Sequence, residues 1–381
     1  MEVLRIRPRR LLIAGLVTVL VHTFIYQSYL GHRIEHFAYD LWFRLRGPVP
    51  PPAKIAIISI DESDYRAVGA STLYPWPRAY HARLLETLAQ KKVTAVALDY
   101  LFIEKGEDAA TDAVLAAAMA KNKTALGTLT LKRRALNQGD LTDLVKELTP
   151  REEFAAAAAA IGSTAVSVDG DRLRRFPKDP SARMPSLARA ALLAAGTDAP
   201  APPPGAYLNY YGPPGAIRTV PCRRVLGLER GGDDADLSGK IVFIGSFLEV
   251  ATSGAPVDMF NTPFSPIAGR LSFGVEIHAA AAANLLDDSW IRRLSKGAEM
   301  IALSLAVFVA STTLLLLPLK GAAVLLGALW LFWPLCAYAL FLKHFFLPRF
   351  WPKRAADRLL THIGSRLVHK CPIVRKRGRG R

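Results

Sequence analysis

The sequence has few cysteines and none of the common catalytic signatures. Its three cysteines, Cys222, Cys336 and Cys371, lie far apart in 381 residues. At most one disulfide can form, which excludes a disulfide scaffold and a multi-cysteine zinc or iron–sulfur site. The chain has no H-E-x-x-H metalloprotease motif and no serine in a nucleophile elbow. We therefore expect no catalytic residue, no bound metal and no cofactor.

A phosphate-binding loop is also missing. Gly239 and Lys240 form the only pair that suggests one, but Ile241 follows the lysine where Ser or Thr would be needed. The expected strand also follows this pair, whereas in a phosphate loop it comes before. We exclude nucleotide binding at this position.

The centre of the chain lacks a charge excess, although the formal net charge is +17. The surplus lies at the two ends, with Arg5, Arg7, Arg9 and Arg10 on one side and eleven Lys/Arg against one acid in residues 349–381 on the other. A nucleic-acid-binding face would need its bases clustered on the folded domain. We expect no nucleic-acid partner, because bases that flank apolar segments are typical of membrane topology.

Three segments, 11–30, 300–319 and 321–342, have no Asp, Glu, Lys or Arg. Each is about as long as a helix that crosses roughly 30 Å of hydrocarbon. For the first, we favour an uncleaved signal anchor over a cleavable signal peptide, which would have a shorter apolar core. Its basic residues 1–10 would stay in the cytoplasm. The other two segments predict a transmembrane hairpin. A hairpin buried in a protein core is the alternative, but neither segment has a polar face.

Residues 31–298 form one long loop, outside the cytoplasm, between the first and second spans. Short β-branched runs alternate with helical stretches, which predicts an α/β domain with a mixed or largely parallel sheet and flanking helices. The expected strands are 54–60, 93–99, 124–130, 163–169, 206–211 and 240–246. The expected helices are 79–90, 108–121, 152–161, 184–195 and 274–286.

Polar residues follow two of the expected strands. Asp61 and Glu62 end the first, Asp99 ends the second, and Trp76 and Arg78 lie between them in a Pro-Trp-Pro-Arg motif. Acids at the carboxyl end of a strand often face a ligand crevice in α/β sheets. If the two strands are neighbours, Asp61 and Asp99 lie side by side and Arg78 pairs with either. The alternative is structural, with Asp61 capping the next turn and the ion pair serving the architecture.

A second group lies later in the chain and contains Asp258, Thr262, Glu276 and His278. Glu276 and His278 do not share a helix face, so they are poor joint metal ligands. A histidine in such a place is more often packed or capping than catalytic. Together with the first group, these residues form the candidate cluster, either ligand-binding or structural.

Seven motifs occur in an order that resembles the CHASE2 family of extracytoplasmic sensory domains, from about Asp40 to Trp290. They are D-L-W-F-R-L-R (40–46), I-x-I-D-E (58–62), P-W-P-R (75–78), A-x-A-L-D-Y-L-F (95–102), K-I-V-F-I-G (240–245), D-x-F-x-T-P (258–263) and V-E-I-H-A (275–279). The resemblance implies a signal anchor, an extracytoplasmic domain, and membrane helices that lead to a cytoplasmic cyclase or kinase. It supplies no ligand and no catalytic residue.

The resemblance implies a multi-pass sensor in the inner (plasma) membrane of a bacterium. Its partners would be the lipid bilayer, an extracytoplasmic ligand, and a second copy or another membrane signalling protein. Only about 39 residues follow Leu342, so we expect a sensor module without its own output domain. The alternative is a truncated or frameshifted CHASE2-containing adenylate/guanylate cyclase. A transporter or channel subunit is disfavoured, because the hairpin segments contain no ionisable residue to mark a pathway.

The basic tail, residues 347–381, raises a conflict between two rules. Three spans counted from a cytoplasmic N-terminus leave the tail outside, whereas the positive-inside rule places its bases in the cytoplasm. We expect this tail to be disordered and to result from truncation or an altered reading frame.

Overall fold

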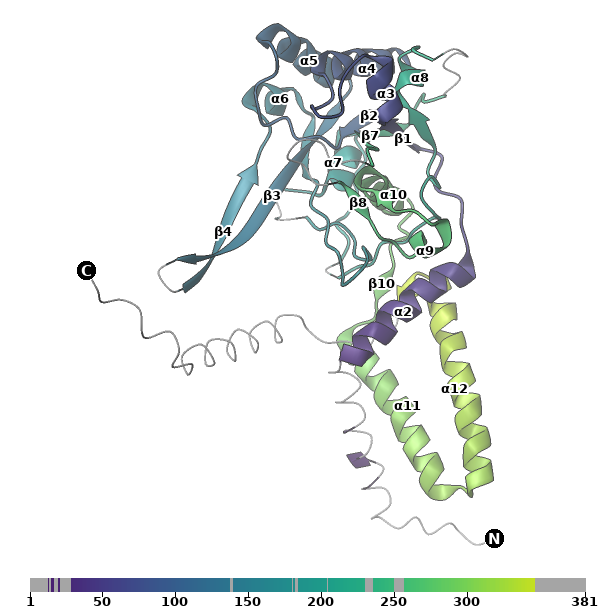
Figure 1. Cartoon of the computed structure of the whole chain (residues 1–381). Coiled ribbons are helices and arrows are strands. Elements are labelled where there is room, and N and C mark those ends of the chain that lie inside the picture. The colour runs from purple at the N-terminus through teal and green to yellow at the C-terminus, as the bar shows by residue number, and fades with distance from the viewer. Residues whose placement is uncertain are drawn as a thin grey trace, which may run out of the picture. The chain divides into compact units, whose positions relative to one another are not determined.

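A computed structural model describes residues 13, 15, 16, 20, 29–137, 140–179, 181, 184–203, 205–229, 236–249 and 257–346. The chain divides into two compact units. The sheet unit consists of Tyr39–Arg293 and Ala337–Phe346, and the helical unit holds the other residues. Most elements of the two units are labelled in Figure 1.

The sheet unit contains a seven-stranded sheet in which β4-β3-β2-β7-β1-β6 are neighbours and β5 also pairs with β3. Only β4 runs antiparallel to its neighbour; every other pairing is parallel. The strands are β1 (Ile55–Ile60), β2 (Ala95–Leu98), β3 (Thr124–Asn137), β4 (Asp140–Leu148), β5 (Ala160–Ser163), β6 (Thr219–Pro221) and β7 (Ile241–Ser246). The expected fold class, an α/β domain with a largely parallel sheet, is confirmed.

Helices cover both faces of this sheet (Figure 1). One face carries α3 (Glu62–Ala67), α4 (Arg78–Gln90), α5 (Ala109–Lys121), α6 (Glu152–Ala157) and α8 (Cys222–Val225). The other face carries α7 (Leu187–Ala194) and α10 (Gly274–Leu286). Because side chains alternate along a strand, Ile58 and Ile60 pack into the core beneath α4 and α5, and Ile57 faces the opposite way. All six residues of β1 are buried, as expected for a parallel strand covered on both sides.

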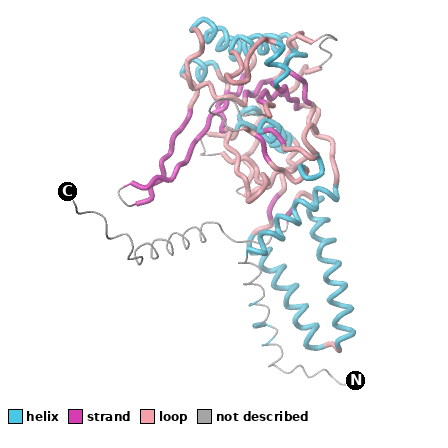
Figure 2. Tube along the Cα trace, in the orientation of Figure 1, coloured by secondary structure: helices cyan, strands magenta, loops and turns pink. Residues whose placement is uncertain are grey.

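Several expected elements end elsewhere. The fourth strand, predicted at 163–169, is β5 at Ala160–Ser163, and α6 stops at Ala157 to make room for it. Residues 206–211 form only isolated bridges, through Tyr207 to Arg175 and Ile291. The strand predicted at 124–130 continues as β3 to Asn137 and turns back as β4, giving the long antiparallel ribbon in Figure 2.

A small hairpin leads into α10. Strands β8 (Met259–Phe260) and β9 (Ser272–Phe273) pair antiparallel around the short helix α9 (Ser265–Ala268). This hairpin brings the residues just before β8 beside the first turn of α10, because Gly274 N donates to Asp258 O at 3.0 Å.

The remaining helices are α2 (Tyr29–Arg46), α11 (Lys296–Leu316) and α12 (Leu319–Leu342). Among the described residues one helix, Lys320–Leu342, is long and apolar enough to cross a membrane, and the apolar stretch of α11, Gly297–Thr313, is shorter. Helices therefore form near both expected positions, joined at Leu317–Pro318, and the crossing of a membrane by two spans stays a prediction. The first expected span, the basic N-terminus 1–10 and the tail 347–381 lie outside the described residues, apart from a few positions of the span.

The sheet unit also includes the ends of two of these helices. Phe43 of α2 packs edge-on against Phe341 of α12, with 5.0 Å between ring centroids. Just beyond α12, β11 (Phe345–Phe346) pairs in parallel with β10 (Arg292–Arg293), which directly precedes α11. The α11–α12 hairpin is thus attached to the sheet unit at both of its ends.

Candidate functional site

The structure distributes the nine predicted site residues over several places. Strand β7 lies between β1 and β2, so Asp61 and Asp99 are not on neighbouring strands. Arg78 begins α4, on the face of the sheet opposite α10. The expectation that Arg78 pairs with Asp61 or Asp99 is wrong, because the order of strands in the sheet differs from their order in the sequence.

Arg78 has another acidic partner. Its Nη1 lies 2.5 Å from Asp112 Oδ1 of α5, and its Nη2 donates to the Glu104 carbonyl oxygen. Burial opposes ionisation of Asp112, but hydrogen bonds from Arg78 and from the Gly106 amide lower its pKa. Trp76, from the same motif, is buried against Tyr65 with a centroid distance of 4.9 Å. The Pro-Trp-Pro-Arg motif therefore joins α4 to α5 and to the core.

Asp61 has the geometry of a helix cap. Its Oδ1 accepts from the amides of Ser63 and Asp64 at 2.7 and 3.0 Å, and Asp64 Oδ2 accepts in return from the Asp61 amide at 2.8 Å. Arg223 of α8 lies 3.0 Å from Asp61 Oδ2. Burial raises the pKa of Asp64 to about 6. Glu62 accepts from the Glu249 amide at 2.8 Å, so both predicted acids bind main chain.

Thr262 and Glu276 also bind local groups. The Thr262 hydroxyl lies 3.1 Å from that of Ser265 at the start of α9. Glu276 accepts from the amides of Gly215 at 2.7 Å and Phe273 at 3.0 Å. This carboxylate holds the first turn of α10 against the 212–215 turn, and its burial raises its pKa.

The last three residues, Asp99, Asp258 and His278, come together and are called the edge cluster. Asp99 follows β2, and alternation from Ala95 and Ala97 puts it on the face covered by α7 and α10. It is half-buried. Parallel strands end at this edge of the sheet, where ligands of open α/β sheets commonly bind.

Asp258 lies over the first turn of α10. Asp258 as a whole is exposed. Its carboxylate nevertheless occupies the space that a Cβ on Gly274 would need. His278 is four residues further along, on the same face of α10 as Gly274. The charge of Asp258 acts on the pKa of His278, so the carboxylate lies near the imidazole.

His278 is 1% exposed and hydrogen-bonded to the main chain of Thr164, while its Nδ1 has no partner. Burial lowers its pKa to about 4, against the opposing effect of Asp258. Burial raises the pKa of Asp99 to about 7. Desolvation raises that of Asp258 to about 6, with a further contribution from the charge of Asp99. Among the residues that the structure describes, the edge cluster thus holds two acids and no basic ion-pair partner.

The edge cluster does not form a metal centre. Within the described ranges, no three His, Cys, Asp or Glu side chains are arranged to hold a metal ion. Its chemistry is that of hydrogen-bond acceptance, from two carboxylates and one imidazole nitrogen.

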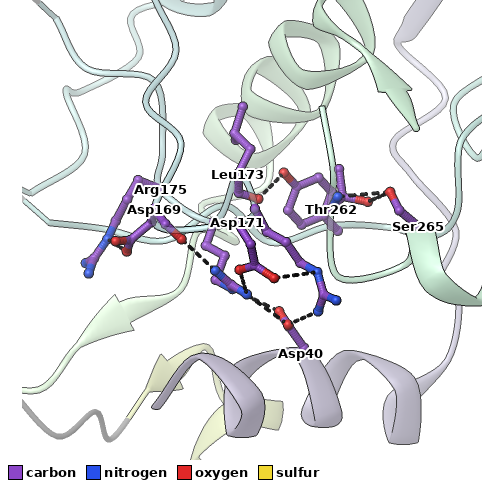
Figure 3. A network of polar contacts seen from close by, with 10 residues as sticks. Asp40, Asp169, Asp171, Leu173, Arg175, Thr262 and Ser265 are labelled. Atoms are coloured by element: carbon purple, nitrogen blue, oxygen red, sulfur yellow. Dashed lines mark hydrogen bonds and ion pairs between the residues drawn. The ribbon is translucent and has the colours of Figure 1, made fainter. Parts of the chain in front are cut away.

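A second polar network, which we call the α2 network, was not predicted as a site (Figure 3). Arg174, 1% exposed, donates to both carboxylate oxygens of Asp40 from Nε and Nη2, each at 3.0 Å. It also donates to the Asp169 carbonyl at 2.7 Å and to Asp171 Oδ1 at 3.0 Å. Arg172 forms a further ion pair with Asp40. The network holds α2 against the 169–175 loop. In the sequence, the motif D-L-W-F-R-L-R, which begins with Asp40, was noted only for its family resemblance.

The sequence matches the profile of the CHASE2 domain over residues 15–316. No curated protein and no solved structure has a significant match. The matched range is wider than the seven motifs, and it includes the sheet unit up to Arg293, all of α2 and all of α11. The chain therefore belongs to the CHASE2 family, and its sheet unit is of an extracytoplasmic, non-catalytic type that serves as the sensory module of signalling proteins.

Proposed function

We propose that this chain is a membrane-anchored sensor of a bacterial plasma membrane, with the sheet unit outside the cytoplasm. The sheet unit would bind an extracytoplasmic ligand and pass the signal through its membrane helices to a signalling partner. The observation that carries this proposal is the CHASE2 match over residues 15–316. The apolar segments at 11–30 and 300–342 support the anchoring.

The packing of the sheet unit suggests how the signal leaves it. The last two turns of α2 and the last of α12 belong to its core, so a change in the sheet unit acts directly on both helices. The Tyr39 hydroxyl of α2 donates to the Leu208 carbonyl oxygen at 2.5 Å. Trp42 of α2 packs against Tyr338 of α12, with 5.4 Å between the ring centroids. A ligand that favours one arrangement of these contacts shifts the population of helix positions by its differential affinity.

Cysteine labelling tests the proposed topology. In a chain with Cys336→Ser and Cys371→Ser, a Leu73→Cys variant places a thiol at a position of the sheet unit that is 62% exposed. We expect a membrane-impermeant maleimide to label it in intact spheroplasts. A matched Val3→Cys variant should be labelled only after permeabilisation. Labelling of Leu73→Cys that requires permeabilisation would contradict the proposal.

A further inference from the structure

We propose that the exposed side of α2 lies in the headgroup layer of an anionic membrane, where its apolar side chains insert between the lipids and a base at its edge meets their phosphates. This rests on the proposed function, since it names the surface that the anchored sensor presents to the bilayer outside its spans. Three observations support it: the exposed side chains of α2, the placement of its charges, and its contacts with the end of α12.

The exposed side of α2 carries an apolar stripe. Ile34 is 40% exposed, Phe37 62% and Leu45 59%, and Leu41 between them is half-buried. These positions follow one another at intervals of three, four and four residues, so they share one side of the helix. We call them the α2 stripe. The helix uses other side chains, among them Phe43, for its contacts with the core, so the α2 stripe remains for another partner.

The charges of α2 suit an anionic surface. Its two acids, Glu35 and Asp40, are 4% and 3% exposed and belong to the buried side. Arg44 is exposed and follows Phe37 by seven residues, about two turns, so it lies along the edge of the α2 stripe. An apolar face bordered by a base is typical of helices that lie in a membrane interface. Two copies of this face packed together would bring two bases to one contact without an exposed acid of α2 between them, which favours lipid over a second copy.

Contacts within the sheet unit place the second half of α2 beside the end of α12. Trp42 packs against Tyr338, and Phe43 packs against Phe341. The 24 residues of α12 extend about 36 Å, which is enough to cross a hydrocarbon layer of roughly 30 Å. When α12 crosses a membrane, its last turn lies at the boundary, and so does the part of α2 that touches it. Trp and Tyr are the side chains enriched at this depth.

The two sides of α2 then have different partners. On the buried side, the Tyr39 hydroxyl donates to the Leu208 carbonyl oxygen, and Asp40 accepts from Arg174. On the exposed side, the α2 stripe meets lipid, and Lys343, an exposed base directly after α12, lies at the same boundary. Lipid and sheet unit therefore act on one helix, which makes the charge of the membrane an input to the sensor.

Spin labels on the full-length chain in nanodiscs test the proposal. In the chain with Cys336→Ser and Cys371→Ser, the variants Phe37→Cys and Leu45→Cys each carry a nitroxide on the α2 stripe. Leu73→Cys, at a position of the sheet unit that is 62% exposed, is the matched control. Electron paramagnetic resonance compares collisions of each label with oxygen, which enters lipid, and with a water-soluble nickel chelate. We expect the ratio of oxygen to chelate collisions to be about threefold higher on the α2 stripe than at the control.

The same labels test the role of lipid charge. Adding phosphatidylglycerol to phosphatidylcholine nanodiscs should raise the collision ratio at Leu45→Cys by about half, because the bases draw α2 toward anionic headgroups. Arg44→Gln combined with Lys343→Gln should remove this increase. Lys105→Gln combined with Lys121→Gln, which neutralises two exposed lysines elsewhere in the sheet unit, should retain it.

Three results would overturn the proposal. A collision ratio on the α2 stripe equal to that at Leu73→Cys would show that the stripe faces water. Spectral broadening at Leu45→Cys that disappears when labelled chains are diluted with unlabelled ones would assign the stripe to a second copy. An effect of phosphatidylglycerol that is absent in the parent, or that persists after Arg44→Gln with Lys343→Gln, would remove the headgroup contact.

The maleimide labelling of Leu73→Cys gives an independent answer on topology. A sheet unit outside the cytoplasm with an α2 stripe in water keeps the proposed sensor and removes only the lipid contact. A sheet unit in the cytoplasm with an α2 stripe in lipid keeps the lipid contact and removes the proposed sensor.

Discussion

The α2 network and the edge cluster are both built on aspartates of the sheet unit, but their charges are balanced differently. In the α2 network, Asp40 is 3% exposed and faces two arginines, one of which is bidentate. In the edge cluster, the charge of Asp99 raises the pKa of Asp258, and the histidine beside them is neutral because burial lowers its pKa. The first arrangement pairs its acid with bases, whereas the second has no basic partner within the part of the chain that the structure describes.

This difference distinguishes a network that holds elements together from acids that lack a base among the described residues. A buried acid that meets its base within the fold contributes to holding elements together, and here it joins α2 to the 169–175 loop. Acids that remain without a base cost stability in the free protein, as groups at functional sites often do. The edge cluster is therefore expected to weaken the fold slightly, and the α2 network to be required for it.

Removal of Arg174 is expected to have the largest effect. An Arg174→Met variant leaves the Asp40 carboxylate buried with Arg172 alone, and we expect a loss of about 3 kcal/mol in the free energy of unfolding. Denaturant titration of the full chain, followed by tryptophan fluorescence, measures it. The matched control is Asp171→Ala, which removes the 64% exposed acid from the same guanidinium and should cost less than about 1 kcal/mol. Equal losses in the two variants would contradict the distinction between buried and exposed partners.

Replacing Asp99 with Asn should stabilise the protein at alkaline pH. The folded-state pKa of Asp99, about 7, lies above its ordinary value of 3.8, so the folded chain holds this proton more tightly than the unfolded chain. That contribution to stability is complete below about pH 4 and is lost as the pH rises to 7. Asn stays neutral throughout, so Asp99→Asn should be more stable than the parent by about 1–3 kcal/mol at pH 8 and equal to it near pH 4. Thermal unfolding at both values checks this, and a variant that is destabilised at pH 8 would show that Asp99 has a base after all.

Asp61 stands between the two cases, because it caps α3 and is also paired with Arg223. An Asp61→Ala variant removes both roles and should cost about 1 kcal/mol in the free energy of unfolding. Asp61→Asn keeps the cap and loses only the partly exposed ion pair, so it should cost a few tenths of a kcal/mol in the free energy of unfolding. The two unfolding curves measured side by side separate the contributions. Equal losses in the two variants would assign the contribution of Asp61 to its charge instead of the cap.

The local sequence pattern was enough to predict individual helices and strands, but it did not predict which strands pair with each other. The helix predicted at 274–286 matches α10, and 240–246 contains β7, because buried strands and apolar helix faces have clear periods. Strand order could not be predicted, since β7 enters the sheet between β1 and β2, which both lie far earlier in the chain. For that reason Asp61 and Asp99 were expected at the ends of neighbouring strands, whereas β7 separates the two strands.

The two polar networks show the same limit. Asp40 and Arg174 are separated by 134 residues, and no local rule connects them. His278 and Asp258 were both selected from the sequence, but the β8–β9 hairpin that brings them together is only two residues long on each side. Gly274 was the available signal, since a glycine at the start of a helix can mark the close approach of another group.

The pairing of β10 with β11 has a consequence for protein engineering. Because Arg293 and Phe346 are held side by side, the chain passes the same point of the sheet unit just before α11 and just after α12. Segments whose two ends meet on the surface tolerate removal better than those that cross a domain. Residues 294–336 can therefore be exchanged for a glycine–serine linker that is long enough to reach from Arg293 to Ala337 and that keeps the Phe43–Phe341 contact. Such a chain would hold the edge cluster and the α2 network without its most apolar helices, in a form suited to crystallisation.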